Sequence, residues 1–126
     1  MTQQYWELPG FEAVYLENSF VLDVVARPGI VALDIELVLT ERHPEYKVPP
    51  AAERHSYRLG QILFEQVTRL HWLSSGFRPA TDASGQSDYG GIDQFIVEGQ
   101  THTLQGDFGE LVIEASHCRV ALTSLI

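Results

Sequence analysis

Side chains that could bind a cation are most concentrated between positions 82 and 93. The run contains Asp82, Ser84, Gln86, Asp88 and Asp93. Calcium takes about six to eight oxygen ligands, and alternating loop residues can present them. The order of residues is nevertheless not that of a calcium-binding loop, because a glycine follows Ser84 directly and no glutamate ends the run. Turn formation by local hydrogen bonds is therefore the favoured interpretation, and we expect no metal here.

The histidines and the single cysteine form no catalytic or metal-binding pattern. No two histidines are two or four residues apart, whereas zinc needs three or four converging ligands. Cys118 alternates with Val120 and Leu122, which predicts a buried and inert thiol, and one cysteine forms no internal disulfide. We therefore expect no catalytic residue and no cofactor. The histidines are His43, His55, His71, His102 and His117.

Aromatic side chains are more informative, because many of them fall in or near predicted loops. Aromatic residues are enriched on surfaces that bind other proteins. The competing and favoured interpretation is that they cover the ends of a β core. The residues concerned are Tyr5, Trp6, Phe11, Tyr15, Tyr46, Phe77, Tyr89 and Phe108.

The elements that position these side chains are predicted to be strands. Every second residue from 31 to 39 is apolar, so one face of that strand is buried. A strand over 21–27 precedes it, and Pro28-Gly29 suits a type II turn. That turn does not match the twist of a two-residue hairpin, so we expect a longer loop or a bulge there.

Residues 56–73 fit two interpretations almost equally. Leucines and a valine at helical spacings favour a helix. Against a helix, Gly60 would cost about 1 kcal/mol relative to alanine. The β-branched and aromatic residues favour two strands, 57–64 and 67–73. Shorter strands are predicted at 92–98, 101–105 and 110–115, with a last strand around Cys118 to Leu122.

Short strands joined by Gly and Asp turns predict an all-β fold. We expect one domain over 1–126, built as an antiparallel β-sandwich or a partly open barrel of about seven to nine strands with little helix. Two long loops, 41–55 and 74–91, connect the strands, and loops of such length are often functional.

The charge of the chain limits its partners. Seventeen acidic and eight basic residues give a formal net charge of −9. Nucleic acid and anionic membranes attract clustered Lys and Arg, so neither is an expected partner, whereas a basic protein is. The N-terminal residues lack a signal-peptide pattern and no apolar run could span a bilayer, so we expect a cytoplasmic location.

Several short motifs, spread over most of the chain, form an arrangement of strands and turns. They are Glu17-Asn18-Ser19, the strand 31–39, Tyr57-Arg58-Leu59-Gly60, Ile62-Leu63-Phe64, Trp72, Asp82-Ala83-Ser84-Gly85, Asp88-Tyr89-Gly90, Ile92-Asp93 and the segment 104–111. This arrangement resembles a broad set of small uncharacterised bacterial β-rich domains, some of which are immunity proteins of polymorphic toxin systems. The resemblance implies strands for 56–73 and no catalytic residue.

These observations predict a non-catalytic domain that binds another protein through its two long loops. Toxin neutralisation is a specific version, in which acidic side chains mimic the substrate of a nuclease toxin. The alternative is a small enzyme or ligand-binding barrel with a pocket at one end, near His71, Asp93 or His102. A homodimer through Val112, Ala121 and Leu125-Ile126 is a further prediction. The residues predicted to bind the partner are Tyr46, Phe77, Asp82, Asp88, Tyr89 and Asp93.

Overall fold

Strands and one short 3₁₀ turn make up the regular structure of the described residues. The computed structural model describes residues 2–49, 56–73, 80–81, 87–88 and 90–123, and within these it contains nine strands. The all-β prediction is confirmed. The elements are β1 (Thr2–Gln4), η1 (Tyr5–Glu7), β2 (Val14–Arg27), β3 (Ile30–Leu39), β4 (Ser56–Leu73), β5 (Ala80–Thr81), β6 (Ser87–Asp88), β7 (Ile92–Glu98), β8 (Thr101–Gly106) and β9 (Gly109–Leu122).

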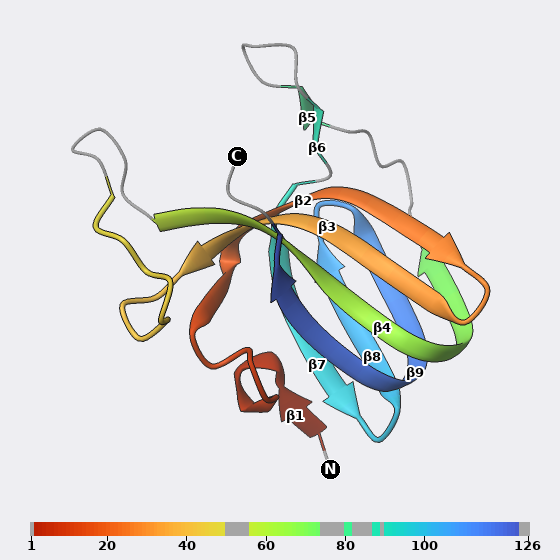
Figure 1. The fold of residues 1–126 in the computed structure, drawn as a ribbon. Coiled ribbons are helices and arrows are strands. Elements are labelled where there is room, and N and C mark those ends of the chain that lie inside the picture. The colour runs from red at the N-terminus through yellow and green to blue at the C-terminus, as the bar shows by residue number, and fades with distance from the viewer. Residues whose placement is uncertain (1, 50–55, 74–79, 82–86, 89, 124–126) are drawn as a thin grey trace.

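Seven strands form one antiparallel sheet in the order β1-β7-β8-β9-β4-β3-β2, and β5 pairs with β6 separately. The sheet curls strongly, so that β2 at one edge reaches the beginning of β7 (Figure 1). A single bridge pairs Phe20 with Gly91, and the Val21 N–H donates to the Gly90 carbonyl at 2.9 Å. The sheet is not closed into a barrel, which is consistent with the predicted sandwich or partly open barrel.

Residues 56–73 form one continuous strand rather than a helix or two strands. β4 pairs with β3 along its first half and with β9 from Gly60 onward. At Gly60 a Cβ atom would lie 2.6 Å from Leu37 Cδ1 and 2.7 Å from the Ala121 carbonyl oxygen, so only glycine fits between the neighbouring strands. Gln66 has a positive φ of 54°, and the pairing with β9 shifts register between Val67 and Arg69, but β4 continues past both points. β9 is likewise one continuous strand, although the sequence predicts two separate strands there, 110–115 and Cys118 to Leu122.

The turn between β2 and β3 is tighter than predicted. Arg27 pairs directly with Ile30, so the turn has only Pro28 and Gly29 as its central residues, and Gly29 has the positive φ of 80° that such a turn requires. The Gly29 carbonyl accepts a hydrogen bond of 3.0 Å from the Val67 N–H on β4, which supports the turn from outside the hairpin. The expected irregularity lies instead inside β2, which begins at Val14.

The core lies on the concave face of the curled sheet. The predicted inward residues of β3, from Val31 to Leu39, are buried as their alternation requires. Phe11, from the segment before β2, is fully buried in this core and packs edge-on against Phe95 of β7. No helix in the described part of the chain is long and apolar enough to cross a membrane. The largest fully buried side chains are Phe11, Phe64, Phe95, Phe108, Leu16, Leu33, Ile35, Leu37, Ile62, Ile92, Leu104 and Leu111.

Candidate functional site

Of the six predicted binding residues, the structure describes the side chains of two, Tyr46 and Asp93, and it does not bring these two together in one site. Phe77, Asp82 and Tyr89 lie outside the described residues, and Asp88 is placed only as part of β6. Tyr46 packs against the core and lines a groove beside β2. Asp93 is exposed near the start of β7 and lines a different hollow. Tyr46 and Asp93 therefore belong to neighbouring but separate depressions.

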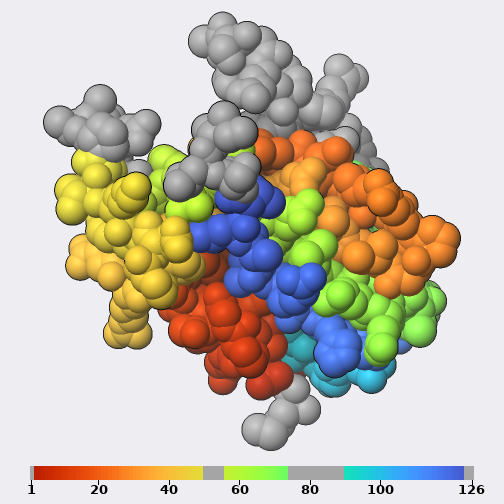
Figure 2. Space-filling view, in the orientation of Figure 1, coloured from red at the N-terminus to blue at the C-terminus, as the bar shows by residue number. Residues whose placement is uncertain are grey.

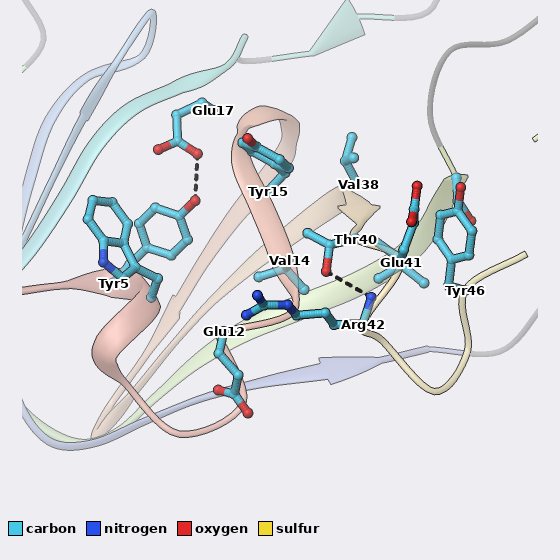
Figure 3. Close-up of a pocket in the computed structure, with 13 residues that line it drawn as sticks. Tyr5, Glu12, Val14, Tyr15, Glu17, Val38, Thr40, Glu41, Arg42 and Tyr46 are labelled. Carbon is cyan, nitrogen blue, oxygen red and sulfur yellow. Dashed lines mark hydrogen bonds between the residues drawn. The ribbon is translucent and has the colours of Figure 1, made fainter. Parts of the chain in front are cut away.

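The larger depression, called the groove below, lies between the N-terminal segment, the start of β2 and the chain after β3 (Figure 3). Its volume is about 750 Å³. In the space-filling view, the chain after β3 (yellow) lies against the N-terminal segment (red) on one side of the molecule (Figure 2). The lining residues are Tyr5, Trp6, Glu12, Val14, Tyr15, Glu17, Val38, Leu39, Thr40, Glu41, Arg42, Tyr46 and Ser56.

A large bulge in β2 shapes one wall of the groove. Between the pairs Tyr15–Val38 and Phe20–Glu36, β2 advances five residues while β3 advances two. Ser19 is fully buried in this bulge, where its hydroxyl donates to the Tyr15 carbonyl at 2.7 Å and accepts from the Val38 N–H at 2.9 Å. The serine thus satisfies backbone groups that the interrupted ladder leaves unpaired.

Tyr5 fixes the carboxylate of Glu17 at the edge of the groove. The Tyr5 hydroxyl donates to Glu17 Oε1 at 2.5 Å and accepts from the Leu16 N–H at 3.3 Å. The Tyr5 side chain is buried, and its ring stacks on Phe95 with centroids 6.4 Å apart. Burial, with the hydrogen bond to Glu17, raises the pKa of Tyr5 well above its usual value, so the phenol stays protonated and acts as a donor.

The opposite wall is tied to the sheet by hydrogen bonds. The Thr40 N–H donates to the Ala13 carbonyl at 3.0 Å, and the Arg42 N–H donates to Thr40 Oγ1 at 3.4 Å. Farther along, Glu45 forms an ion pair with Arg58 on β4, with 3.0 Å between Oε1 and Nη1. The first two bonds fix the segment after β3 against the residues before β2, and the Glu45–Arg58 ion pair anchors it to the sheet.

Charge and aromatic surface distinguish the groove. Its lining contains three carboxylates, from Glu12, Glu17 and Glu41, and one guanidinium, from Arg42, which extends toward the N-terminal side (Figure 3). Trp6 and Tyr15 are each 50% exposed, although large aromatic side chains are usually well buried. The groove therefore offers negative charge beside flat apolar surface, a combination that suits a cationic and partly apolar ligand.

A smaller depression of about 320 Å³, called the side hollow below, adjoins the groove. Tyr5, Trp6 and Glu17 line both depressions, so these three residues stand where the two meet. Asp93 adds a second carboxylate to the side hollow, which has no Lys or Arg in its lining. The remaining lining residues are Gln4, Leu16, Ile92, Gln94, Phe95 and Gln105.

The reactive side chains are placed away from both depressions. Burial raises the pKa of the Cys118 thiol to about 12, which agrees with the predicted inert cysteine. His102 is buried against Phe64, its Nδ1 lies 3.2 Å from the Ile113 carbonyl, and burial lowers its pKa. His71 is exposed on β4. Among the described residues, no three His, Cys, Asp or Glu side chains cluster as they would to hold a metal ion.

Sequence reasoning missed the acidic half of the groove. Trp6 and Tyr15 stand out as aromatics near loops, but Glu12, Glu17 and Glu41 are scattered over thirty residues of an acidic chain. The one local signal is Ser19, a polar residue at the start of an apolar strand pattern, which marks the bulge that carries Glu17.

Comparisons of the chain with protein-family models, curated proteins and solved structures found no match. The functional argument therefore depends on the geometry and charge of the groove.

Proposed function

We propose that the protein is a non-catalytic interaction domain that binds a basic segment of a partner protein in the groove. The observation that carries this proposal is the lining itself: three carboxylates and one guanidinium surround half-exposed Trp6 and Tyr15. Aromatic side chains at an exposed depression supply contact area at small entropic cost, and the carboxylates favour a cationic partner.

The charge of the whole chain supports the same partner. A net charge of −9 attracts basic proteins over several ångströms and repels nucleic acid. The site proposed here differs from the one expected from sequence, because it keeps Tyr46 and replaces the loop 74–91 with the N-terminal segment and β2.

Toxin neutralisation is the specific version of this proposal. A nuclease toxin has a basic active-site surface that acidic side chains of the groove could cover. The sequence resemblance and the negative charge support it, and a cytoplasmic location belongs to the same proposal. Co-expression with a toxin encoded beside the gene should restore growth, and the Glu12→Gln/Glu41→Gln variant should lose this protection. Absence of a neighbouring toxin gene in related genomes would contradict this version.

Calorimetric titration with two peptides tests the general proposal. Hexalysine should bind at low salt, hexaglutamate should not, and the affinity for hexalysine should fall as salt increases. Glu12→Gln/Glu41→Gln should weaken hexalysine binding about three- to tenfold. The matched control is Glu98→Gln/Glu114→Gln, which removes equal charge outside both depressions. If both double variants weaken hexalysine binding equally, the peptide responds only to the net charge of the protein. That result would overturn the groove as the binding site.

A pocket for a small molecule is the alternative function. The volume of about 750 Å³ favours it, because ligand pockets commonly occupy about 300–1,000 Å³. A small compound that raises the melting temperature and displaces hexalysine from the groove would support this alternative. If only basic peptides displace hexalysine and no small compound does, the protein-binding proposal is preferred.

A homodimer also stays a prediction. Val112 and Ala121 are half-buried on β9, but they lie near its opposite ends, and Leu125-Ile126 lie outside the described residues. Light scattering that gives a monomer mass at high protein concentration would exclude this dimer.

A further inference from the structure

Trp6 and Glu17 stand together where the groove meets the side hollow. Both residues line both depressions, so a side chain that crosses from one to the other passes them. Carboxylates lie on either side of this crossing, with Glu12 and Glu41 in the groove and Asp93 in the side hollow. A cationic side chain at the crossing is therefore favoured from both directions.

The Glu17 carboxylate is held in place before any ligand binds. Oε1 accepts from the Tyr5 hydroxyl, and Tyr5 is itself fixed by burial and by the Leu16 N–H. Within the described residues, Oε2 has no hydrogen bond. An oriented carboxylate with a free oxygen suits a planar guanidinium, because less conformational entropy is lost when the pair forms.

Trp6, which lines the same two depressions as Glu17, supplies an exposed aromatic surface there. Its side chain is half-exposed, and its ring packs edge-on against Tyr5 with centroids 5.1 Å apart, which limits its movement. An arginine stacks its flat guanidinium on such a ring while donating to a carboxylate. A lysine ammonium, which is a compact and strongly hydrated charge, does not combine both contacts as well.

We infer that the Trp6–Glu17 crossing recognises an arginine side chain of the partner, in preference to lysine. This inference rests on the proposed function, since it names the residue type that the basic segment presents. Trp6 and Glu17 contact the guanidinium, and Tyr5 is a positioning residue that acts through Glu17. Hexa-arginine and hexalysine peptides, blocked at both ends, test it because they carry the same charge.

Calorimetry should show that the wild-type protein binds hexa-arginine about two- to fivefold more tightly than hexalysine. Trp6→Leu should reduce this ratio to about one while hexalysine binding changes little. Tyr5→Phe keeps the ring and the net charge but frees Glu17, so it should also lower the ratio. Glu98→Gln is the control and should leave the ratio unchanged. Amide chemical shifts of each variant verify that the fold is kept.

The outcomes separate the inference from the proposed function. Equal affinity for the two peptides in the wild type, or an unchanged ratio in Trp6→Leu, would overturn arginine recognition and leave the basic-partner proposal intact. A ratio that falls equally in Glu98→Gln would also overturn it. Binding of neither peptide at millimolar concentration would overturn both.

Discussion

The two ladders on either side of β3 differ in regularity, and the groove lies beside the irregular one. On one side, β3 pairs with β4 from Ile30–Glu65 to Leu39–Ser56 without a register shift. On the other side, its pairing with β2 shifts twice, and the larger shift contains Ser19. In a regular ladder, side chains point alternately to the two faces of the sheet. A bulge changes the direction of the backbone, so that side chains near it can point elsewhere. The comparison indicates that the β3–β4 ladder supplies stability and the β2 bulge supplies the site.

Phe64→Ala should produce the largest loss of stability, because it removes a core ring from the regular ladder. Phe64 is fully buried and packs against Phe95 and His102. Loss of a buried Phe costs about 3–5 kcal/mol. Leu59→Ala, on the same strand but 41% exposed, is the matched control and should cost much less. Urea unfolding measures both, and similar costs for the two variants would contradict the assignment of stability to this ladder.

Ser19→Ala should cost less in stability but should damage the groove more. The substitution leaves the buried Val38 N–H without its acceptor, which costs about 1–3 kcal/mol. Because Ser19 holds the bulge that carries Glu17, binding of hexa-arginine should weaken as well. The exposed Ser116→Ala is the control for both measurements. A variant of wild-type stability and affinity would show that the bulge holds its shape without the serine.

The regular half of the molecule was predictable from sequence, and the irregular half was not. The alternation from Val31 to Leu39 predicts its burial directly, because a strand that packs one face on a core has a period of two. Local pattern alone left Ser56–Leu73 open, since the fit of Gly60 against Leu37 and Ala121 is a tertiary contact. The groove joins residues from three separate segments through a bulge, and no local spacing encodes that arrangement.

Acid should lower the stability of the fold through His102, which is buried on β8 against Phe64 of the regular ladder. Burial lowers the folded-state pKa of His102, while the unfolded chain titrates near the usual value of about 6.5. Below that pH the unfolded state binds more protons, so stability falls as the pH decreases, by at most about 1.4 kcal/mol per pH unit. His102→Gln should reduce this slope between pH 7.5 and 5, whereas the exposed His117→Gln should not. Equal slopes would exclude His102 as the cause.

Arg42→Ala should give the smallest effect and should act on the groove alone. Arg42 is the one cation in the groove lining, it is exposed, and its charge opposes a basic ligand. Its removal should tighten hexalysine binding about twofold at low salt, since exposed charge interactions contribute about 0.2–1 kcal/mol. Arg119→Ala changes the net charge equally but lies on β9, where Arg119 pairs with Glu65. If the two variants tighten binding equally, the ligand responds to overall charge, and the bulged side of the molecule has no special role in recognition.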